Sequence, residues 1–166
     1  SLPADLSIAP FPYRALPAEP ERINYYESSR GCPFRCSYCL SCRDGRVRTL
    51  PLERVKEDLG YFVYKNVKQV KLVDRTFNFQ PERARAIFRY LLENDNGTTN
   101  FHFEMCGELL DAETLALLSK ARPGQFQFEI GVQSTNPDTV RAVGRQGDYR
   151  ALAQGVEALL EADRIH

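Results

Sequence analysis

Strand-like and helix-like segments alternate four times along the chain, and this alternation constrains the fold more than any other feature. The expected strands cover residues 23–27, 67–73, 100–106 and 125–132. Apolar stripes of helical spacing follow them at Leu52, Val55, Leu59, Phe62 and Val63, at Ala84, Ile87, Phe88, Leu91 and Leu92, at Leu115, Leu117 and Leu118, and at Leu152, Val156, Leu159 and Leu160. Repeating βα units of this length predict a parallel sheet with right-handed crossovers.

The last two strands predict what kind of sheet this is. In the segments NFHFEMC and QFQFEIGV, large apolar residues alternate with polar ones. A strand of a doubly wound sheet is apolar on both faces because helices cover both. One polar face instead predicts a curved sheet around a polar lumen. Since a complete eight-fold barrel takes about 250 residues, we predict an α/β fold with a partial (β/α) barrel of about four parallel units.

The ends of the chain differ from this core in composition. Residues 1–22 hold five of the ten prolines, which predicts an extended arm or an interdomain linker because proline fixes the backbone and removes a donor. Residues 23–166 form the expected core domain, which stops where a fifth strand should begin.

Charge and hydropathy narrow the class of protein. The 22 basic residues balance the 22 acidic ones, so there is no clear signal for nucleic acid and no general attraction to anionic lipid. No apolar run is long enough to span a membrane, and the N-terminus lacks the pattern of a signal peptide. We therefore expect a cytoplasmic protein, in which clustered cysteines more often bind metal than each other.

Four of the five cysteines lie within eleven residues, in the segment CPFRCSYCLSC. Cys32, Cys36 and Cys39 have the spacing CxxxCxxC, and Cys42 follows three residues later. A structural zinc usually takes its ligands from two separated segments. An electron-transfer cluster with the spacing CxxCxxC would use Cys36, Cys39 and Cys42, but it needs a further cysteine, for which Cys106 is one candidate.

The position of the cysteines favours a cluster that takes part in chemistry. They directly follow the first strand, and chemistry in βα folds occurs at the carboxyl-terminal ends of the strands. A cubic cluster held by three thiolates keeps one iron with open coordination, as catalytic metal sites do. Zinc binding or simple electron transfer, without such chemistry, is the alternative.

CxxxCxxC at the end of the first strand, with an aromatic residue (Tyr38) before the third cysteine, resembles the radical S-adenosylmethionine (radical SAM) superfamily. The resemblance implies an enzyme whose [4Fe–4S] cluster, held by Cys32, Cys36 and Cys39, binds SAM and cleaves it reductively to a 5′-deoxyadenosyl radical that abstracts hydrogen from a small-molecule substrate. It also implies an electron donor of the flavodoxin or ferredoxin type.

The longer motifs SSRGCPFRCSYCLSCRDGRVR, VDRTFN, FHFEMCGELL and FEIGVQSTN narrow the resemblance. They are similar to radical SAM proteins with an N-terminal cobalamin-binding domain. That class includes methyltransferases and the anaerobic magnesium-protoporphyrin IX monomethyl ester cyclase. The resemblance implies that the full-length parent has a cobalamin domain and a C-terminal region, with cobalamin-dependent methyl transfer or tetrapyrrole ring cyclisation as candidate reactions.

The same resemblance implies that polar residues at the strand ends contact SAM. The expected residues are Tyr38, Asp74, Thr76, Glu104, Glu129, Gln133 and Ser134. Of the remaining polar side chains, we expect His102 to be a hydrogen-bonded histidine and Arg145 a solvated charge at a helix end. We expect a solvated surface from Arg30, Arg35, Arg43, Arg46, Arg48 and Lys56. Cys42 is expected to be a bystander thiol.

Overall fold

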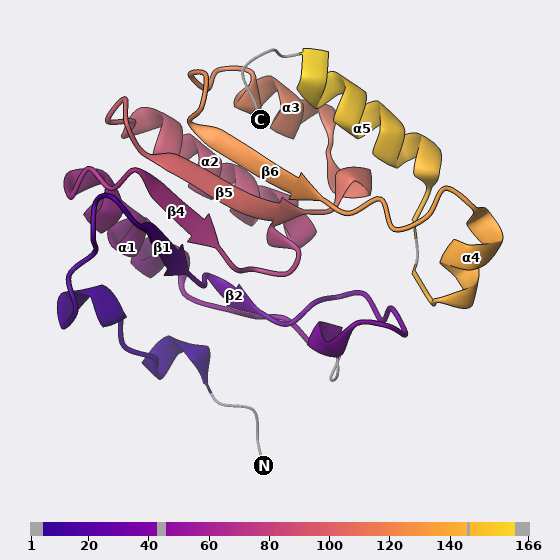
Figure 1. Ribbon diagram of the computed structural model, residues 1–166, viewed down its shortest axis with the longest axis horizontal. Helices are drawn as coiled ribbons and strands as arrows, with labels where there is room; N and C mark the ends of the chain where they lie inside the picture. Colours follow the sequence, from indigo (N-terminus) through magenta and orange to yellow (C-terminus); the bar gives the residue numbers. More distant parts are fainter. Residues whose placement is uncertain (1–4, 43–45, 146, 162–166) are drawn as a thin grey trace.

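The computed structural model describes residues 5–42, 46–145 and 147–161 and shows the expected four parallel βα units. The strands β1 (Ile23–Tyr26), β4 (Gln69–Leu72), β5 (Asn100–Met105) and β6 (Phe126–Ile130) form one parallel sheet in the order β1-β4-β5-β6 (Figure 1). The predicted α/β fold, an incomplete barrel of four parallel units, is therefore confirmed.

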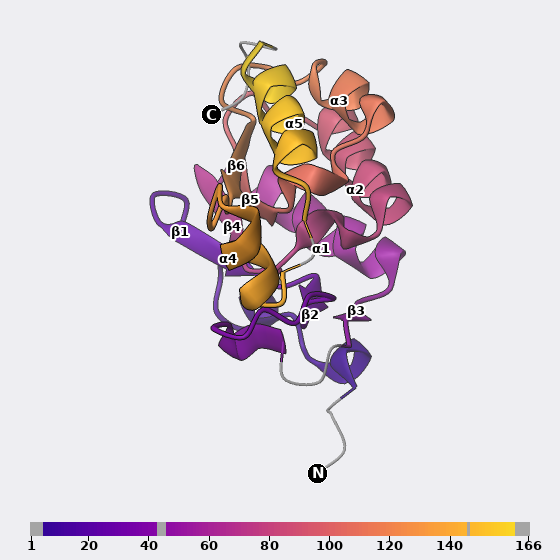
Figure 2. The same ribbon diagram turned by 90° about the vertical axis from the view of Figure 1, so that its right-hand side faces the viewer.

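The helices α1 (Leu52–Tyr64), α2 (Pro81–Glu93) and α3 (Ala112–Leu118) cover one face of the sheet (Figure 2). α5 (Tyr149–Glu161) lies beyond β6 and adds Leu159 to the same core, whereas the short α4 (Pro137–Ala142) lies away from the sheet and buries none of its residues (Figure 1). The apolar stripes predicted from the sequence supply the buried residues, except that Leu160 is 69% exposed and its predicted inward position is wrong. No helix of the described ranges is long and apolar enough to cross a membrane.

Local signals explain where several helices begin. Pro81 is the first residue of α2, where its fixed backbone angle suits the helix and its missing N–H costs nothing. Asp111 is the N-cap of α3, where its side chain accepts a hydrogen bond from the Thr114 N–H. α5 packs against the 3₁₀ turn η5 (Gly107–Leu109), where a β-carbon on Gly155 would lie 2.7 Å from the Gly107 carbonyl oxygen.

The proline-rich arm packs onto the domain. Its described part contains the 3₁₀ turns η1 (Leu6–Ile8) and η2 (Pro12–Arg14), and it buries Leu6, Phe11 and Ala18 in the main core. Arg54 of α1 donates hydrogen bonds to two carbonyl oxygens of the arm. The arm is irregular, as its prolines predict, but in this part it is packed rather than a free spacer.

Two short elements enclose the cysteine segment. β2 (Ser29–Arg30) pairs antiparallel with β3 (Arg48–Thr49). We call the segment between these strands the cysteine loop; it contains the 3₁₀ turn η3 (Leu40–Cys42). The hairpin was not predicted, because strands of two residues are too short to produce a detectable pattern.

Candidate functional site

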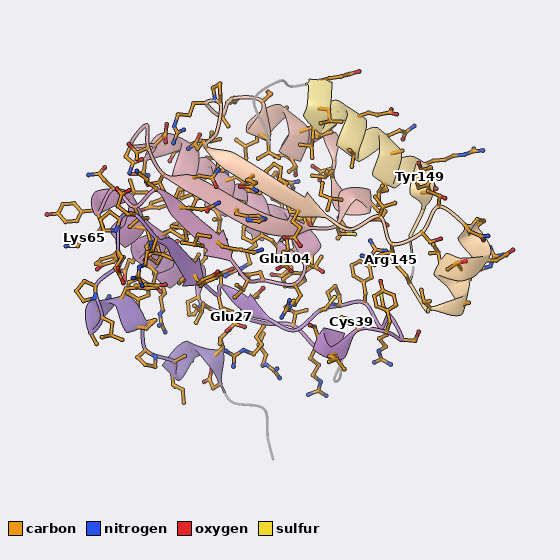
Figure 3. The ribbon with its side chains drawn as sticks, viewed as in Figure 1. Glu27, Cys39, Lys65, Glu104, Arg145 and Tyr149 are labelled. Carbon is orange, nitrogen blue, oxygen red and sulfur yellow. The ribbon has the colours of Figure 1, made fainter. Side chains whose placement is uncertain are left out.

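The candidate site is a cavity of about 380 Å³ where the cysteine loop meets the carboxyl-terminal ends of β4, β5 and β6. It is lined by Cys32, Phe34, Cys36, Tyr38, Cys39, Ser41, Arg75, Thr76, Glu104, Met105, Cys106, Glu129, Ile130, Gly131, Gln133 and Arg145. Cys39, Glu104 and Arg145 mark three of its sides in Figure 3. This edge of a parallel βα array is where such folds bind their ligands.

The cysteine loop is held at its base and near its tip. At the base, Gly31 has a φ of +105°, and a β-carbon there would lie 2.1 Å from the Arg46 carbonyl oxygen, so only glycine fits. Near the tip, the Ser37 N–H donates a 2.8 Å hydrogen bond to the Val143 carbonyl oxygen beyond α4. The loop is therefore attached to the last part of the domain as well as to the first.

Cys32, Cys36 and Cys39 all line the cavity, the first two buried and the third partly exposed. The Thr76 Oγ1 lies 3.4 Å from the Cys32 Sγ, and the Ser41 N–H donates to the Cys39 Sγ at 3.4 Å. The Cys42 side chain lies outside the described residues, as does Arg43.

Five of the seven predicted SAM-contacting residues line the cavity with these cysteines. They are Tyr38, Thr76, Glu104, Glu129 and Gln133. Glu129 lies 3.1 Å from the Lys71 Nζ, and Glu104 lies 3.8 Å from the Arg75 guanidinium. The cavity wall thus carries two carboxylates, each with a cation nearby.

Asp74 and Ser134 lie apart from this group. Asp74 is fully buried, and its carboxylate accepts hydrogen bonds from Ser28 and Ser29. Burial raises the pKa of Asp74 against these hydrogen bonds, which lower it. Ser134 lines a separate depression beside α4 and accepts a hydrogen bond from the Asn136 N–H. Neither side chain is part of the cavity wall.

Arg145 is not the solvated helix-end charge that we expected. Its side chain is 12% exposed, pairs with Glu108 at 3.3 Å and donates to the Gly131 carbonyl oxygen at 3.2 Å. Its guanidinium lies 6.0 Å from the centroid of the Phe34 ring. Partial burial and a hydrogen bond with Cys36 raise the pKa of Tyr38, whereas a hydrogen bond with Arg145 lowers it. Arg145 therefore connects the cysteine loop to the ends of β5 and β6.

Glu108 is a functional candidate that the sequence did not single out, and its partner Cys106 was named only as a candidate fourth ligand of an electron-transfer cluster. Cys106 is buried in the cavity wall, and its thiol donates to Glu108 at 2.9 Å. Burial and the neighbouring Glu108 carboxylate raise the pKa of Cys106 to about 12, so this side chain is a neutral thiol. Glu108 gave no signal because its partner Arg145 is 37 residues away in the sequence.

His102 also differs from expectation. The Nε2 atom of His102 is buried and lies 3.4 Å from Glu129 Oε2, but it makes no hydrogen bond. The prediction of a hydrogen-bonded histidine is therefore wrong. By contrast, Arg30, Arg35 and Arg46 are exposed, as expected of a solvated surface. Arg48 and Lys56 are only partly exposed. Arg30 pairs with Glu27, and Lys56 pairs with Glu53.

Comparison with models of protein families shows to which family this chain belongs. The model of the radical SAM superfamily matches residues 26–165. The chain belongs to the radical SAM superfamily. This membership identifies it as part of an enzyme and agrees with the resemblance seen in the cysteine motif.

Curated relatives of the chain are longer proteins. An uncharacterized methyltransferase of Pyrococcus horikoshii is 38% identical over 60 residues, which are 34% of this chain and 13% of the relative. The GTP 3′,8-cyclase of Alkaliphilus oremlandii is 25% identical over 143 residues, which are 81% of this chain and 42% of the relative. The chain thus spans less than half the length of either protein.

Solved structures agree with the radical SAM fold. The radical S-adenosylmethionine methyltransferase TsrM from Kitasatospora setae, with tryptophan and a SAM analogue bound, has a TM-score of 0.72 at 16% identity over 90% of this chain and 29% of that chain. The cobalamin-dependent radical enzyme OxsB has a TM-score of 0.70 at 17% identity over 87% of this chain and 23% of that chain. At these identities the similarity concerns the fold.

The donor set fits the iron–sulfur cluster that radical SAM membership implies. Thiolates are the usual ligands of such clusters, and three cysteines share the wall of one cavity. Among residues 5–42, 46–145 and 147–161, no three His, Cys, Asp or Glu side chains gather as a site for a metal ion. A cluster does not need one meeting point, because each thiolate binds a different iron.

Proposed function

We propose that this chain is the core of a radical SAM enzyme, with Cys32, Cys36 and Cys39 holding a [4Fe–4S] cluster and SAM bound in the cavity beside them. The observation that carries the proposal is the shared cavity, in which the three cysteines face polar ends of three parallel strands. When bound, the cluster supplies the electron that cleaves SAM to a 5′-deoxyadenosyl radical.

The polar side chains of the cavity match the functional groups of SAM in charge and hydrogen-bonding capacity. SAM carries an ammonium, a carboxylate and a ribose diol, and the wall offers Glu104 and Glu129 as acceptors and Arg145 as a cation. Thr76 and Gln133 add a hydroxyl and an amide, and Tyr38 adds an aromatic ring for the adenine. We propose that these residues orient SAM, and that Asp74 and Ser134 do not contact it.

Iron analysis tests the ligand assignment. After anaerobic reconstitution, we expect four irons and four sulfides per chain, lost in Cys32→Ala and retained in Cys42→Ala. Cys106→Ala is the matched control for a cavity cysteine outside the motif and should keep the cluster. A site that uses Cys36, Cys39 and Cys42 gives the opposite result for Cys32 and Cys42. Stoichiometric zinc in oxygen-protected protein would contradict the proposal.

A spectroscopic test separates SAM chemistry from plain electron transfer. Adding SAM to the reduced protein should change the electron paramagnetic resonance spectrum of the cluster, because SAM binds the iron that no cysteine holds. A spectrum that SAM leaves unchanged supports an electron-transfer module instead.

For the parent protein, we propose cobalamin-dependent methyl transfer, with tetrapyrrole ring cyclisation as the competing reaction. The fold similarity to a radical SAM methyltransferase and to a cobalamin-dependent radical enzyme, together with the short sequence match to a methyltransferase, supports methyl transfer as the first choice. We also propose that the parent has a cobalamin domain and receives electrons from a flavodoxin or ferredoxin. The full-length protein incubated with SAM, cobalamin and a reductant should release 5′-deoxyadenosine, and methyl transfer adds S-adenosylhomocysteine.

A further inference from the structure

Asp74 is a buried carboxylate that the proposed SAM site does not use. Its Oδ2 accepts a 3.0 Å hydrogen bond from the Ser28 N–H, and its Oδ1 accepts hydrogen bonds of 2.6 and 2.5 Å from the Ser28 and Ser29 hydroxyls. Asp74 is fully buried, Ser28 is 1% exposed and Ser29 is 2% exposed. Three donors on one buried carboxyl group form a rigid connection, because losing any of them leaves a buried polar group without its partner.

The two serines are the base of the cysteine loop. They follow β1 after the single residue Glu27, and Ser29 is the first residue of β2. The returning limb joins the same place: Thr49 pairs with Ser29, and the Leu50 N–H donates a 2.9 Å hydrogen bond to the Ser28 carbonyl oxygen. Asp74 therefore holds the outgoing limb of the loop directly and the returning limb through the hairpin.

The turn that begins at Asp74 also reaches the first cysteine and the next strand. Two residues on, the Thr76 hydroxyl lies 3.4 Å from the Cys32 Sγ. Asn78 in the 3₁₀ turn η4 (Phe77–Phe79) binds the backbone of Cys106 through both its amide atoms, at 2.8 and 2.9 Å. One short segment after β4 thus fixes the loop base, touches a cysteine sulfur and binds the end of β5.

We propose that Asp74 is a positioning residue that orders the cysteine loop before any cluster binds, by holding Ser28 and Ser29 so that Cys32 faces the cavity. This inference deepens the proposed function and rests on it, because only a cluster-binding role gives the ordered cysteine loop a purpose. The order itself is a property of the apoprotein, so it can be measured without cluster, SAM or activity.

Alkylation of the cluster-free, reduced chain tests this order. The rate at which iodoacetamide modifies Cys32, resolved from the other cysteines by peptide mass spectrometry, reports how often the loop base opens. Asp74→Asn should speed the modification of Cys32 about tenfold or more, the effect expected from losing hydrogen bonds to a buried charge. Cys39 is already partly exposed and should change much less.

Asp58→Asn is the matched control. Asp58 is also a buried carboxylate, 2% exposed, but its partners are the Tyr26 hydroxyl and Arg54 rather than the two serines at the base of the cysteine loop. This variant should leave the modification of Cys32 at the wild-type rate. Equal rates in folded Asp74→Asn and wild type would overturn the inference. The same increase at all cysteines in both aspartate variants would also overturn it, because it would indicate general destabilisation.

Two further measurements keep the test decisive. If Asp74→Asn does not fold, Ser29→Ala removes a single donor and should still speed the modification of Cys32 without affecting Asp58 contacts. In reconstituted protein, Asp74→Asn should also lose iron to a chelator faster than Asp58→Asn. A chain that binds no cluster but shows the selective change at Cys32 supports the role of Asp74 and contradicts the proposed function.

Discussion

One face of the parallel sheet packs into the core and the other leads to the candidate site, and β5 contributes side chains to both. On one face, Phe103 packs against Phe77, Phe88 and Phe126, with ring centroids 4.5, 5.1 and 5.9 Å away. On the other face, His102 and Glu104 lie among polar side chains and lead to the cavity. Because strand side chains alternate, a single strand joins the stabilising core to the site.

The polar face is built in layers across the sheet. Tyr25, Lys71, His102 and Gln127 are in register, one from each strand. The Gln69 amide donates to Asn100, its partner in the neighbouring layer, at 3.2 Å and to Gln127 of the first layer at 3.3 Å, which joins the two layers. The helix-covered face excludes water through aromatic packing, whereas this face is held by hydrogen bonds and ion pairs. We therefore expect substitutions on the two faces to differ in kind.

Phe103→Ala should have the largest effect on stability. Phe103 is fully buried, and deleting such a ring removes transfer free energy and leaves a cavity, which together cost about 3–5 kcal/mol. Urea denaturation measures this loss of the free energy of unfolding. Glu104→Gln, the next residue on the opposite face, should cost less than about 1 kcal/mol, because its pairing with Arg75 is partly exposed. Similar losses for both would contradict the division of tasks.

The pH dependence of stability isolates His102. Burial, and secondarily Lys71, lower the pKa of His102 in the folded protein, whereas an unfolded histidine titrates near about 6.5. Below that value an unfolded chain binds more protons at this residue, so the contribution of His102 to the free energy of unfolding should fall as the pH drops from about 8 to about 5.

His102→Gln supplies the comparison for this prediction. The variant should lack the part of the pH dependence that comes from His102. Buried Asp58 and Asp74, whose pKa values burial raises, titrate in both proteins and cancel in the difference. Identical pH profiles for the two proteins would mean that His102 is not perturbed in the folded state.

The sequence predicted the features that depend on periodicity. The apolar stripes identified α1, α2, α3 and α5 but not the short α4, which buries no residue, and the alternation in β5 and β6 identified the two faces and the polar residues Glu104 and Glu129 of the cavity. The cysteine spacing identified the loop. These features were readable because each depends on residues that are close in the sequence.

The features that the sequence did not predict depend on side-chain directions outside regular helices and strands, where no sequence period determines them. Asp74 and Thr76 were both expected to contact SAM, but β4 ends at Leu72, and beyond that point alternation no longer sets where a side chain points. Arg145 was taken for a surface charge because Glu108 and Gly131, which hold it, come from other segments. Contacts of this kind require the tertiary structure.

The smallest predicted effect is the coupling between Lys71 and Glu129 on the polar face. Their side chains are 26% and 58% exposed and 3.1 Å apart, so water and salt screen their attraction. A double-mutant cycle with Lys71→Met and Glu129→Gln should give a coupling of about 0.2–1 kcal/mol, which added salt reduces.

If Glu129 also contacts SAM as proposed, Glu129→Gln should weaken SAM binding while leaving the free energy of unfolding nearly unchanged. A loss of stability as large as that of Phe103→Ala would mean that the polar face supports the fold rather than the chemistry.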